Sequence, residues 1–202
     1  MSAPNINSEE AKTFKALFSG YSQAHGAFEI KETDSQTGKI KGNARTMHRG
    51  ATLREWEEHL AGGPKGLGAI PLLDDGVSVK WAAIDIDDNQ IDHYCLEAKV
   101  IELALPLVVC RSKSGGAHCY LFLEKPCPAK DAVDALKNWS AALGHPGVEI
   151  FPKQICREVD EKTGNTRPGN WIEQRGRNWC TLPWKPSVIA SEWHSCSPSS
   201  RG

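Results

Sequence analysis

Residues 80–88 read KWAAIDIDD, an apolar run that ends in alternating carboxylates. In an extended strand Ile84 and Ile86 would share one face, and Asp85 and Asp87 the other. Carboxylates spaced about 6 to 7 Å apart on a rigid strand repel each other, and a hard divalent cation bound through oxygen relieves that repulsion. The pattern is therefore typical of a metal site. A solvated acidic turn at the end of an edge strand explains the same pair, so the segment alone leaves both interpretations open.

The order of elements around this segment predicts the fold class. The expected elements are a strand at about 79–87, a helix at 91–105, a strand at 107–110, a polar turn at 111–116, a strand at 117–124, a helix at 128–143 and a strand at 147–151. The order β-α-β-β-α-β is the split βαβ, or ferredoxin-like, plan that RNA-recognition modules share. The sequence therefore predicts an α+β fold.

This plan predicts which polar residues come together. The first and third strands are central and antiparallel, and the fourth flanks the first. Asp85 and Asp87 then lie beside His118 at the start of the third strand and Glu149 at the start of the fourth. Alternation turns their strand neighbours toward the helices and leaves all four polar residues on the open face. Convergence from three strands favours a functional site over a solvated turn.

The turn at residues 111–116 has the sequence RSKSGG and leads to the same place. Two cations, two hydroxyls and two glycines suit the binding of phosphate oxygens, although such a segment alone is also an ordinary hairpin turn. Three carboxylates beside a phosphate-binding turn indicate two-metal phosphoryl or nucleotidyl transfer.

The N-terminal part carries fewer signals. A helix is predicted from Ser8 to about Gly20, followed by a strand and loops over 21–50. Thr52 and Glu55 fit a capping box that opens a second helix, which the Gly62-Gly63-Pro64 segment ends. We expect a turn at 66–68 and a short strand at 69–72.

Composition limits the classes of protein that fit. The chain has 202 residues, 40% of them hydrophobic, and a formal net charge of -1, which suits a soluble globular domain and argues against uniform coating of nucleic acid. No apolar run is long enough for a membrane span and the first residues lack the order of a signal peptide, so no membrane partner and a cytoplasmic location are expected. Seven cysteines without a CxxC pair favour free thiols over a zinc site.

Several segments together resemble the archaeo-eukaryotic primase superfamily, particularly the primase-polymerases of the TOTE conflict-system type. They are AIDID at 83–87, RSKSGGAH at 111–118, VEIFPKQ at 148–154 and GNWI at 169–172, with WEEHLAGG at 56–63 and GLGAIPL at 66–72 before them. The resemblance spans about residues 14–172. It implies a catalytic domain at 1–175, in which an N-terminal α/β unit (about 1–76) packs with an RRM-like unit (about 77–175). The polar EQRGRN at 173–178 departs from the family pattern, so 176–202 is expected to be an irregular or truncated tail.

The resemblance also implies roles for individual residues. Asp85, Asp87 and Glu149 would ligate two Mg²⁺ or Mn²⁺ ions, while the incoming triphosphate would contact Arg111, Lys113, Ser114 and His118. The implied function is a DNA primase-polymerase domain that transfers nucleotides to a template-paired 3′-OH or to an initiating nucleotide. Its expected partners are single-stranded or primed DNA, nucleoside triphosphates, and a helicase domain or subunit outside this chain.

Two other functions remain open at this stage. A non-catalytic RRM-like nucleic-acid-binding module would need exposed aromatics, for which Tyr120 and Phe122 are candidates. A DxD metal-dependent phosphohydrolase of the haloacid dehalogenase kind usually has Thr or Val after the acid pair, where this chain has Asp88 and Asn89.

Basic residues on both sides of the acidic centre predict a template track: Lys39, Lys41, Arg45, Arg49, Lys153, Arg157, Arg167, Arg175 and Arg177.

Overall fold

The computed structural model describes residues 8–33, 40–160, 164 and 166–174. These residues form an α+β fold with two antiparallel four-stranded sheets and four helices. The elements are α1 (Ser8–Leu17), β1 (His25–Thr33), β2 (Ile40–Met47), α2 (Leu53–Leu60), β3 (Lys65–Ala69), β4 (Ser78–Ile86), α3 (His93–Glu102), β5 (Val108–Arg111), β6 (Ala117–Pro128), α4 (Ala129–Ala142), β7 (Glu149–Phe151) and β8 (Ile172–Gln174). Within the described ranges, no helix is both long and apolar enough to cross a membrane.

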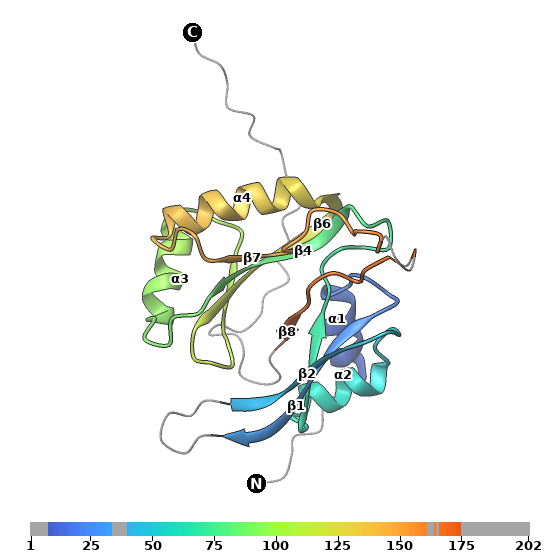
Figure 1. Cartoon of the computed structure of the whole chain (residues 1–202). Helices are drawn as coiled ribbons and strands as arrows, with labels where there is room; N and C mark the ends of the chain where they lie inside the picture. Colours follow the sequence, from blue (N-terminus) through green and yellow to red (C-terminus); the bar gives the residue numbers. More distant parts are fainter. Residues whose placement is uncertain (1–7, 34–39, 161–163, 165, 175–202) are drawn as a thin grey trace.

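The central sheet has the strand order β5-β6-β4-β7, and all its neighbours are antiparallel. Its two inner strands are the first and third of the β-α-β-β-α-β order, as the sequence predicts. Helices α3 and α4 cover one face of this sheet (Figure 1). Ile84 and Leu121 on that face pack with Leu96 of α3 and Leu136 of α4 in one buried cluster. Burial of this alternating apolar set fixes which side chains face away from the helices.

The opposite face of the central sheet packs in a second buried cluster with residues of α1, α2, β3 and β8. The Phe18 ring, just after α1, lies 5.2 Å from the rings of both Tyr120 and Phe122, measured between centroids. Those two aromatic residues are only 1% and 2% exposed. The interpretation of Tyr120 and Phe122 as exposed base-stacking residues is therefore wrong, because this cluster buries them.

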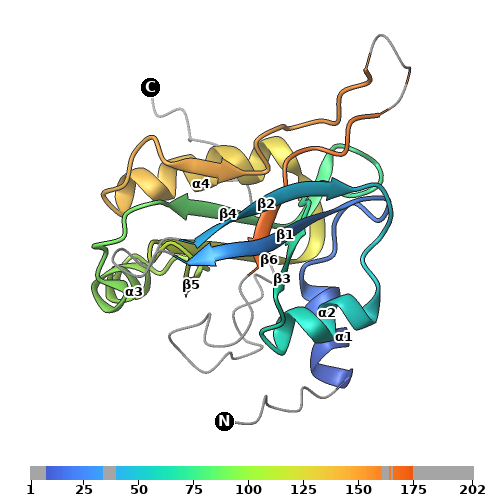
Figure 2. The ribbon, with the colours of Figure 1, turned by 60° about the horizontal axis from the view of Figure 1, so that its bottom comes forward.

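The N-terminal sheet has the order β2-β1-β3-β8, and two of its strands were not predicted. Strand β2 has the sequence IKGNARTM, which lacks the apolar alternation by which strands are recognised. Strand β8 follows the last predicted strand and pairs with β3, so that Ile172 lies opposite Ala69. Figure 2 shows β1, β2 and β3 together, with α1 and α2 beside each other at one end.

The glycines at 66–68 lie inside strand β3 and not in a turn, which corrects the expected strand at 69–72. A Cβ atom on Gly68 would lie 2.2 Å from the Trp171 ring, and one on its strand partner Gly26 would lie 2.0 Å from it. A Cβ on Gly66 would meet the Glu173 carboxylate at 2.1 Å. Gly26 and Gly68 leave room for the Trp171 ring directly against the β1 and β3 backbone, whereas a side chain at Gly66 would displace the Glu173 carboxylate.

The boundary expected near residue 76 separates the strands of the two sheets, with one exception. Strand β8 falls within 77–175 but completes the N-terminal sheet. The range expected for the RRM-like unit therefore contributes one strand to the N-terminal sheet. The expected tail at 176–202 lies outside the described residues.

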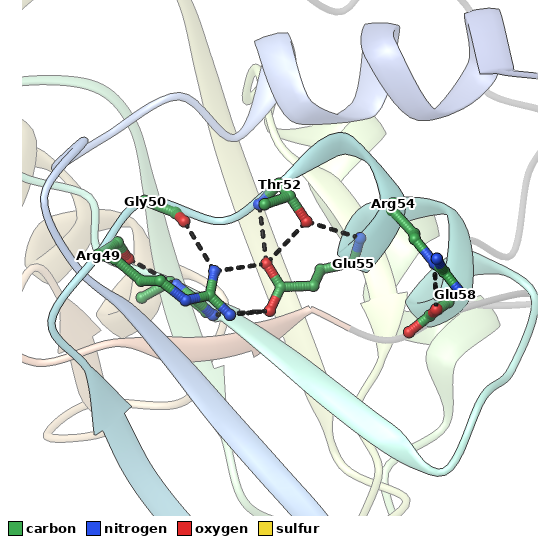
Figure 3. A network of polar contacts seen from close by, with 7 residues as sticks. Arg49, Gly50, Thr52, Arg54, Glu55 and Glu58 are labelled. Atoms are coloured by element: carbon green, nitrogen blue, oxygen red, sulfur yellow. Dashed lines mark hydrogen bonds and ion pairs between the residues drawn. The ribbon is translucent and has the colours of Figure 1, made fainter.

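The predicted capping box at the start of α2 is present (Figure 3). The Thr52 hydroxyl accepts from the Glu55 backbone N–H at 3.2 Å, and the Glu55 carboxylate accepts from the Thr52 N–H at 2.8 Å. Both guanidinium ends of Arg49 also donate to Glu55, at 2.8 and 2.5 Å. These bonds to Arg49, which outweigh partial burial, lower the pKa of Glu55 from 4.5 to about 2, with Thr52 and His25 adding to the effect.

Replacing Glu55 with Gln is expected to lower the free energy of unfolding by about 1 to 2 kcal/mol at neutral pH, after allowing for solvent screening. Because the folded pKa lies below the unfolded one, this stability is present above about pH 4.5 and is lost as the pH falls toward 2. Denaturant unfolding between pH 7 and 2.5 measures it. Glu58→Gln, which loses only the exposed contact of Glu58 with Arg54, is the control. An equal gap between Glu55→Gln and wild type at both pH values would contradict the assignment.

Candidate active site

Asp85, His118 and Glu149 form one row across the central sheet. In the strand register Asp85 of β4 lies opposite His118 of β6 on one side and opposite Glu149 of β7 on the other. Directly opposed residues of antiparallel strands have Cβ atoms about 4.5 to 5.5 Å apart. The sequence predicted from strand order and alternation that these three residues and Asp87 would come together, and the register brings Asp85, His118 and Glu149 side by side. Asp87 comes just after β4 ends and is exposed.

Each carboxylate of this group has a different neighbour. Asp85 Oδ1 lies 3.3 Å from His118 Nε2, Asp87 Oδ1 accepts from the Ser114 hydroxyl at 3.0 Å, and Glu149 Oε2 lies 2.8 Å from Lys153 Nζ. Among the described residues, no three His, Cys, Asp or Glu side chains are arranged so that together they could hold a metal ion.

The donor set nevertheless fits Mg²⁺ or Mn²⁺, which prefer hard carboxylate oxygens. To share an ion with Asp85, the carboxylates of Glu149 and Asp87 would turn away from Lys153 and Ser114. Both contacts are solvent-exposed, and breaking an exposed polar contact costs only about 0 to 1 kcal/mol. An ion shared by the three carboxylates would therefore require Glu149 and Asp87 to leave only these exposed contacts.

His118 is 8% exposed, and both of its ring nitrogens have neighbours. Nε2 faces Asp85, while Nδ1 lies 2.9 Å from the Tyr120 hydroxyl. Tyr120 also stands on β6, two residues further along, so both side chains are on the same face. The imidazole is therefore held between a carboxylate at the open end of the face and a hydroxyl under the N-terminal helices.

The turn between β5 and β6 is fixed against the end of β4. Its backbone closes through a Ser112 N–H bond to the Gly116 carbonyl at 2.7 Å, and Gly115 adopts a left-handed φ of 99°. A Cβ on Gly116 would lie 2.1 Å from the Ile86 carbonyl oxygen, so only glycine permits this approach. Nε2 of His93, the first residue of α3, also lies 2.9 Å from the Gly116 oxygen. The two glycines therefore place the turn next to Asp87.

The predicted nucleotide-binding side chains of the turn point in different directions. Ser114 faces the acids through Asp87, and Arg111 is exposed at the end of β5. Lys113 instead reaches the N-terminal sheet, where Nζ lies 2.7 Å from Glu173 Oε2 and 3.7 Å from the centroid of the Phe28 ring. Ser114 and His118 are thus in contact with the acidic group, whereas Lys113 connects the turn to β8 and β1.

A family model described as TOTE conflict system, Archaeo-Eukaryotic Primase domain, matches residues 10–154. The chain belongs to this family. The match includes all seven candidate site residues, and the GNWI segment at 169–172 lies past its end. No curated protein matches the sequence. Family membership indicates a primase-like domain, a class that binds nucleic acid and nucleotides.

Three neighbours of the site in this primase-family domain were not predicted from the sequence. Tyr120 carried a usable signal, since it shares strand parity with His118. Lys153 carried none beyond its charge, because a spacing of four residues pairs side chains on a helix and Glu149 lies in strand β7. Glu173 carried none, because it is 60 residues from Lys113 in the sequence. Its role depends on the pairing of β8 with β3.

The described cations of the predicted template track have local partners. Arg45 binds Glu29 at 2.8 Å, Arg49 binds Glu55, Lys153 binds Glu149, Arg167 binds Asp160 at 3.0 Å, and Arg157 stacks 4.1 Å from the Tyr21 ring centroid and donates to the Asp74 carbonyl. Lys39, Arg175, Arg177 and the side chain of Lys41 lie outside the described part. Apart from Arg157, whose two partners are uncharged, the described cations of this track are therefore paired with carboxylates.

Proposed function

We propose that this chain is a DNA primase-polymerase domain that catalyses two-metal nucleotidyl transfer. The growing end would be a template-paired 3′-OH or an initiating nucleotide, and the donor a nucleoside triphosphate. The observation that carries the proposal is the position of Asp85, in register with both His118 and Glu149, at the strand end where the glycine-rich turn is fixed. The β-α-β-β-α-β order along the chain and the spatial strand order β5-β6-β4-β7 support an RRM-like arrangement for the unit that carries this site.

The proposal gives each residue a role. Asp85, Asp87 and Glu149 would hold two Mg²⁺ or Mn²⁺ ions, which when bound stabilise charge on the attacking and leaving oxygens. The triphosphate would lie against the turn, where Ser114 and the exposed Arg111 donate hydrogen bonds, with His118 at the edge of the acids. Lys113 would also contact the triphosphate, from its position between the turn and Glu173.

The phosphohydrolase alternative loses support from the fold. That chemistry requires a nucleophilic aspartate after the first strand of a Rossmann-like parallel sheet, whereas every strand pair of the central sheet is antiparallel. A helicase domain or subunit remains a proposed partner, based only on the family resemblance.

The deciding experiment supplies the purified chain with Mg²⁺ or Mn²⁺, labelled nucleoside triphosphates, and primed or unprimed single-stranded DNA. We expect template-dependent incorporation that stops when a chelator is in excess. Incorporation at full rate in excess chelator would overturn the metal mechanism. Phosphate release without incorporation would indicate a hydrolase, and template binding alone would indicate a non-catalytic module.

Binding of single-stranded DNA is expected to be weak and to depend on salt. The net charge is -1 and the described cations are locally paired, so only about two to four phosphate contacts are expected. The plot of log Kobs against log salt concentration should then have a slope of about -1.4 to -2.8. Fluorescence anisotropy between low and moderate salt measures it. Arg45→Gln should reduce the slope, whereas Lys130→Gln on α4 should not; an affinity that does not change with salt would count against the track.

A further inference from the structure

A chain of polar contacts connects the buried interior to the acidic row. The Tyr120 hydroxyl is hydrogen-bonded to His118 Nδ1 at 2.9 Å, and His118 Nε2 lies 3.3 Å from Asp85 Oδ1. Tyr120 is 1% exposed, His118 is 8% exposed, and the Asp85 side chain is 24% exposed. These contacts therefore end at Asp85, whose strand β4 lies between the strands of His118 and Glu149.

The hydrogen atoms in this chain can be assigned from donor and acceptor chemistry. Burial raises the pKa of Tyr120 well above its usual value, with the neighbouring Cys110 and Asp85 adding to the effect, so the phenol keeps its proton. An ionised carboxylate can only accept. A neutral imidazole carries one N–H. If that N–H were on Nδ1, the lone pair of Nε2 would face the Asp85 oxygen and two acceptors would oppose each other. The proton therefore belongs on Nε2, and Nδ1 accepts from Tyr120.

We propose that Tyr120 is a positioning residue: its hydroxyl donates to Nδ1 of His118 and so, together with Asp85, keeps the imidazole proton on Nε2, toward Asp85. Asp85 favours this tautomer, and the bond from Tyr120 reinforces it and holds the ring in place. A partner behind a ligand-contacting histidine commonly acts in this way. In the proposed function, on which this consequence rests, the Nε2–H is also the donor directed at the triphosphate, so its placement serves either acceptor.

The matched variant is Tyr120→Phe, which keeps the ring that packs against Phe18 and removes only the hydroxyl. Tyr94→Phe is the control, since Tyr94 lies on α3 with 77% of its surface exposed. The direct measurement is the tautomer of His118, obtained by NMR of ¹⁵N-histidine-labelled protein at about pH 8, where histidines are usually neutral. A spectrum of His118→Ala identifies the His118 signals.

In wild type and in Tyr94→Phe we expect the proton of His118 on Nε2 alone. In Tyr120→Phe only Asp85 still favours this tautomer, so we expect the form with the proton on Nδ1 to appear beside it as a detectable minor fraction. A wild-type proton on Nδ1, or a Tyr120→Phe spectrum unchanged from wild type, would overturn the proposal. The wild-type spectrum decides the assignment of the proton even if Tyr120→Phe does not fold.

Activity gives a second, separate readout. Tyr120→Phe should lower nucleotide incorporation by about 10- to 100-fold, the range for partners that orient a ligand-contacting residue. In a His118→Ala background the same change should cause no further loss, because Tyr120 acts only through the imidazole. Additive losses would contradict the proposal. If the tautomer is as stated and no form of the protein incorporates nucleotides, the proposed function fails while the assignment of Tyr120 and His118 stands.

Discussion

Asp85→Asn is expected to abolish metal-dependent nucleotide incorporation, with a loss of more than about 1000-fold. Asparagine has the shape of aspartate and can still accept from His118, so the variant removes the charge and little else. Asp85 lies between His118 and Glu149 in the strand register, so it is the central carboxylate of the proposed metal site. Primer extension with Mg²⁺ or Mn²⁺ measures the loss.

Stability provides the check that this variant is folded. Removing one of several adjacent carboxylates relieves repulsion, so the Tm should stay the same or rise. Asp88→Asn is the matched control, since Asp88 is exposed and its side chain accepts from the Gln90 N–H, which asparagine can also do. We expect that control to keep incorporation within about threefold of wild type. Near-normal incorporation by Asp85→Asn would sink the proposed mechanism.

His118→Ala is expected to lower incorporation by about 10- to 1000-fold, the effect of removing one well-placed donor. Divalent-ion binding, measured by calorimetry with nucleotide absent, should persist, because the three carboxylates are retained. Nucleotide binding should weaken in the same titration.

Two other outcomes for His118→Ala are informative. Loss of ion binding in the absence of nucleotide would mean that the imidazole is itself a metal ligand. If His118→Ala changed neither nucleotide binding nor incorporation, His118 beside Asp85 would have no part in nucleotide transfer. Ser114→Ala, which removes the hydroxyl that contacts Asp87 at 3.0 Å, serves as the milder comparison.

The acidic row could be predicted because it depends on local signals and one topological rule. Strand parity places Asp85 on the face of the sheet away from α3 and α4. The order of the central strands brings His118 and Glu149 to its two sides. Both facts follow from elements that the apolar periodicity identifies. The partner of each carboxylate was harder to predict, since Lys153 and Ser114 reach their acids through side-chain orientations that spacing does not encode.

The N-terminal sheet could not be predicted because its local signals are misleading. Gly66 and Gly68 indicate a turn when they are read alone, yet both lie in strand β3, and Gly68 leaves room for the Trp171 ring. Likewise Tyr120 and Phe122 fit an exposed binding face until Phe18 and the rest of the N-terminal cluster are placed over them. In both cases a contact between distant segments overrides the local preference.

The position of β8 has a consequence for the order in which the molecule is assembled. Its Ile172 pairs with Ala69, so β3 gains this neighbour only when nearly all of the described chain has been synthesised. Pairings between such distant segments form slowly compared with hairpins such as β1 and β2. Glu173, which binds Lys113 of the glycine-rich turn, arrives with the same strand. A nascent chain can therefore complete the acidic row once Glu149 has been added, and it acquires the anchor of the neighbouring turn afterwards.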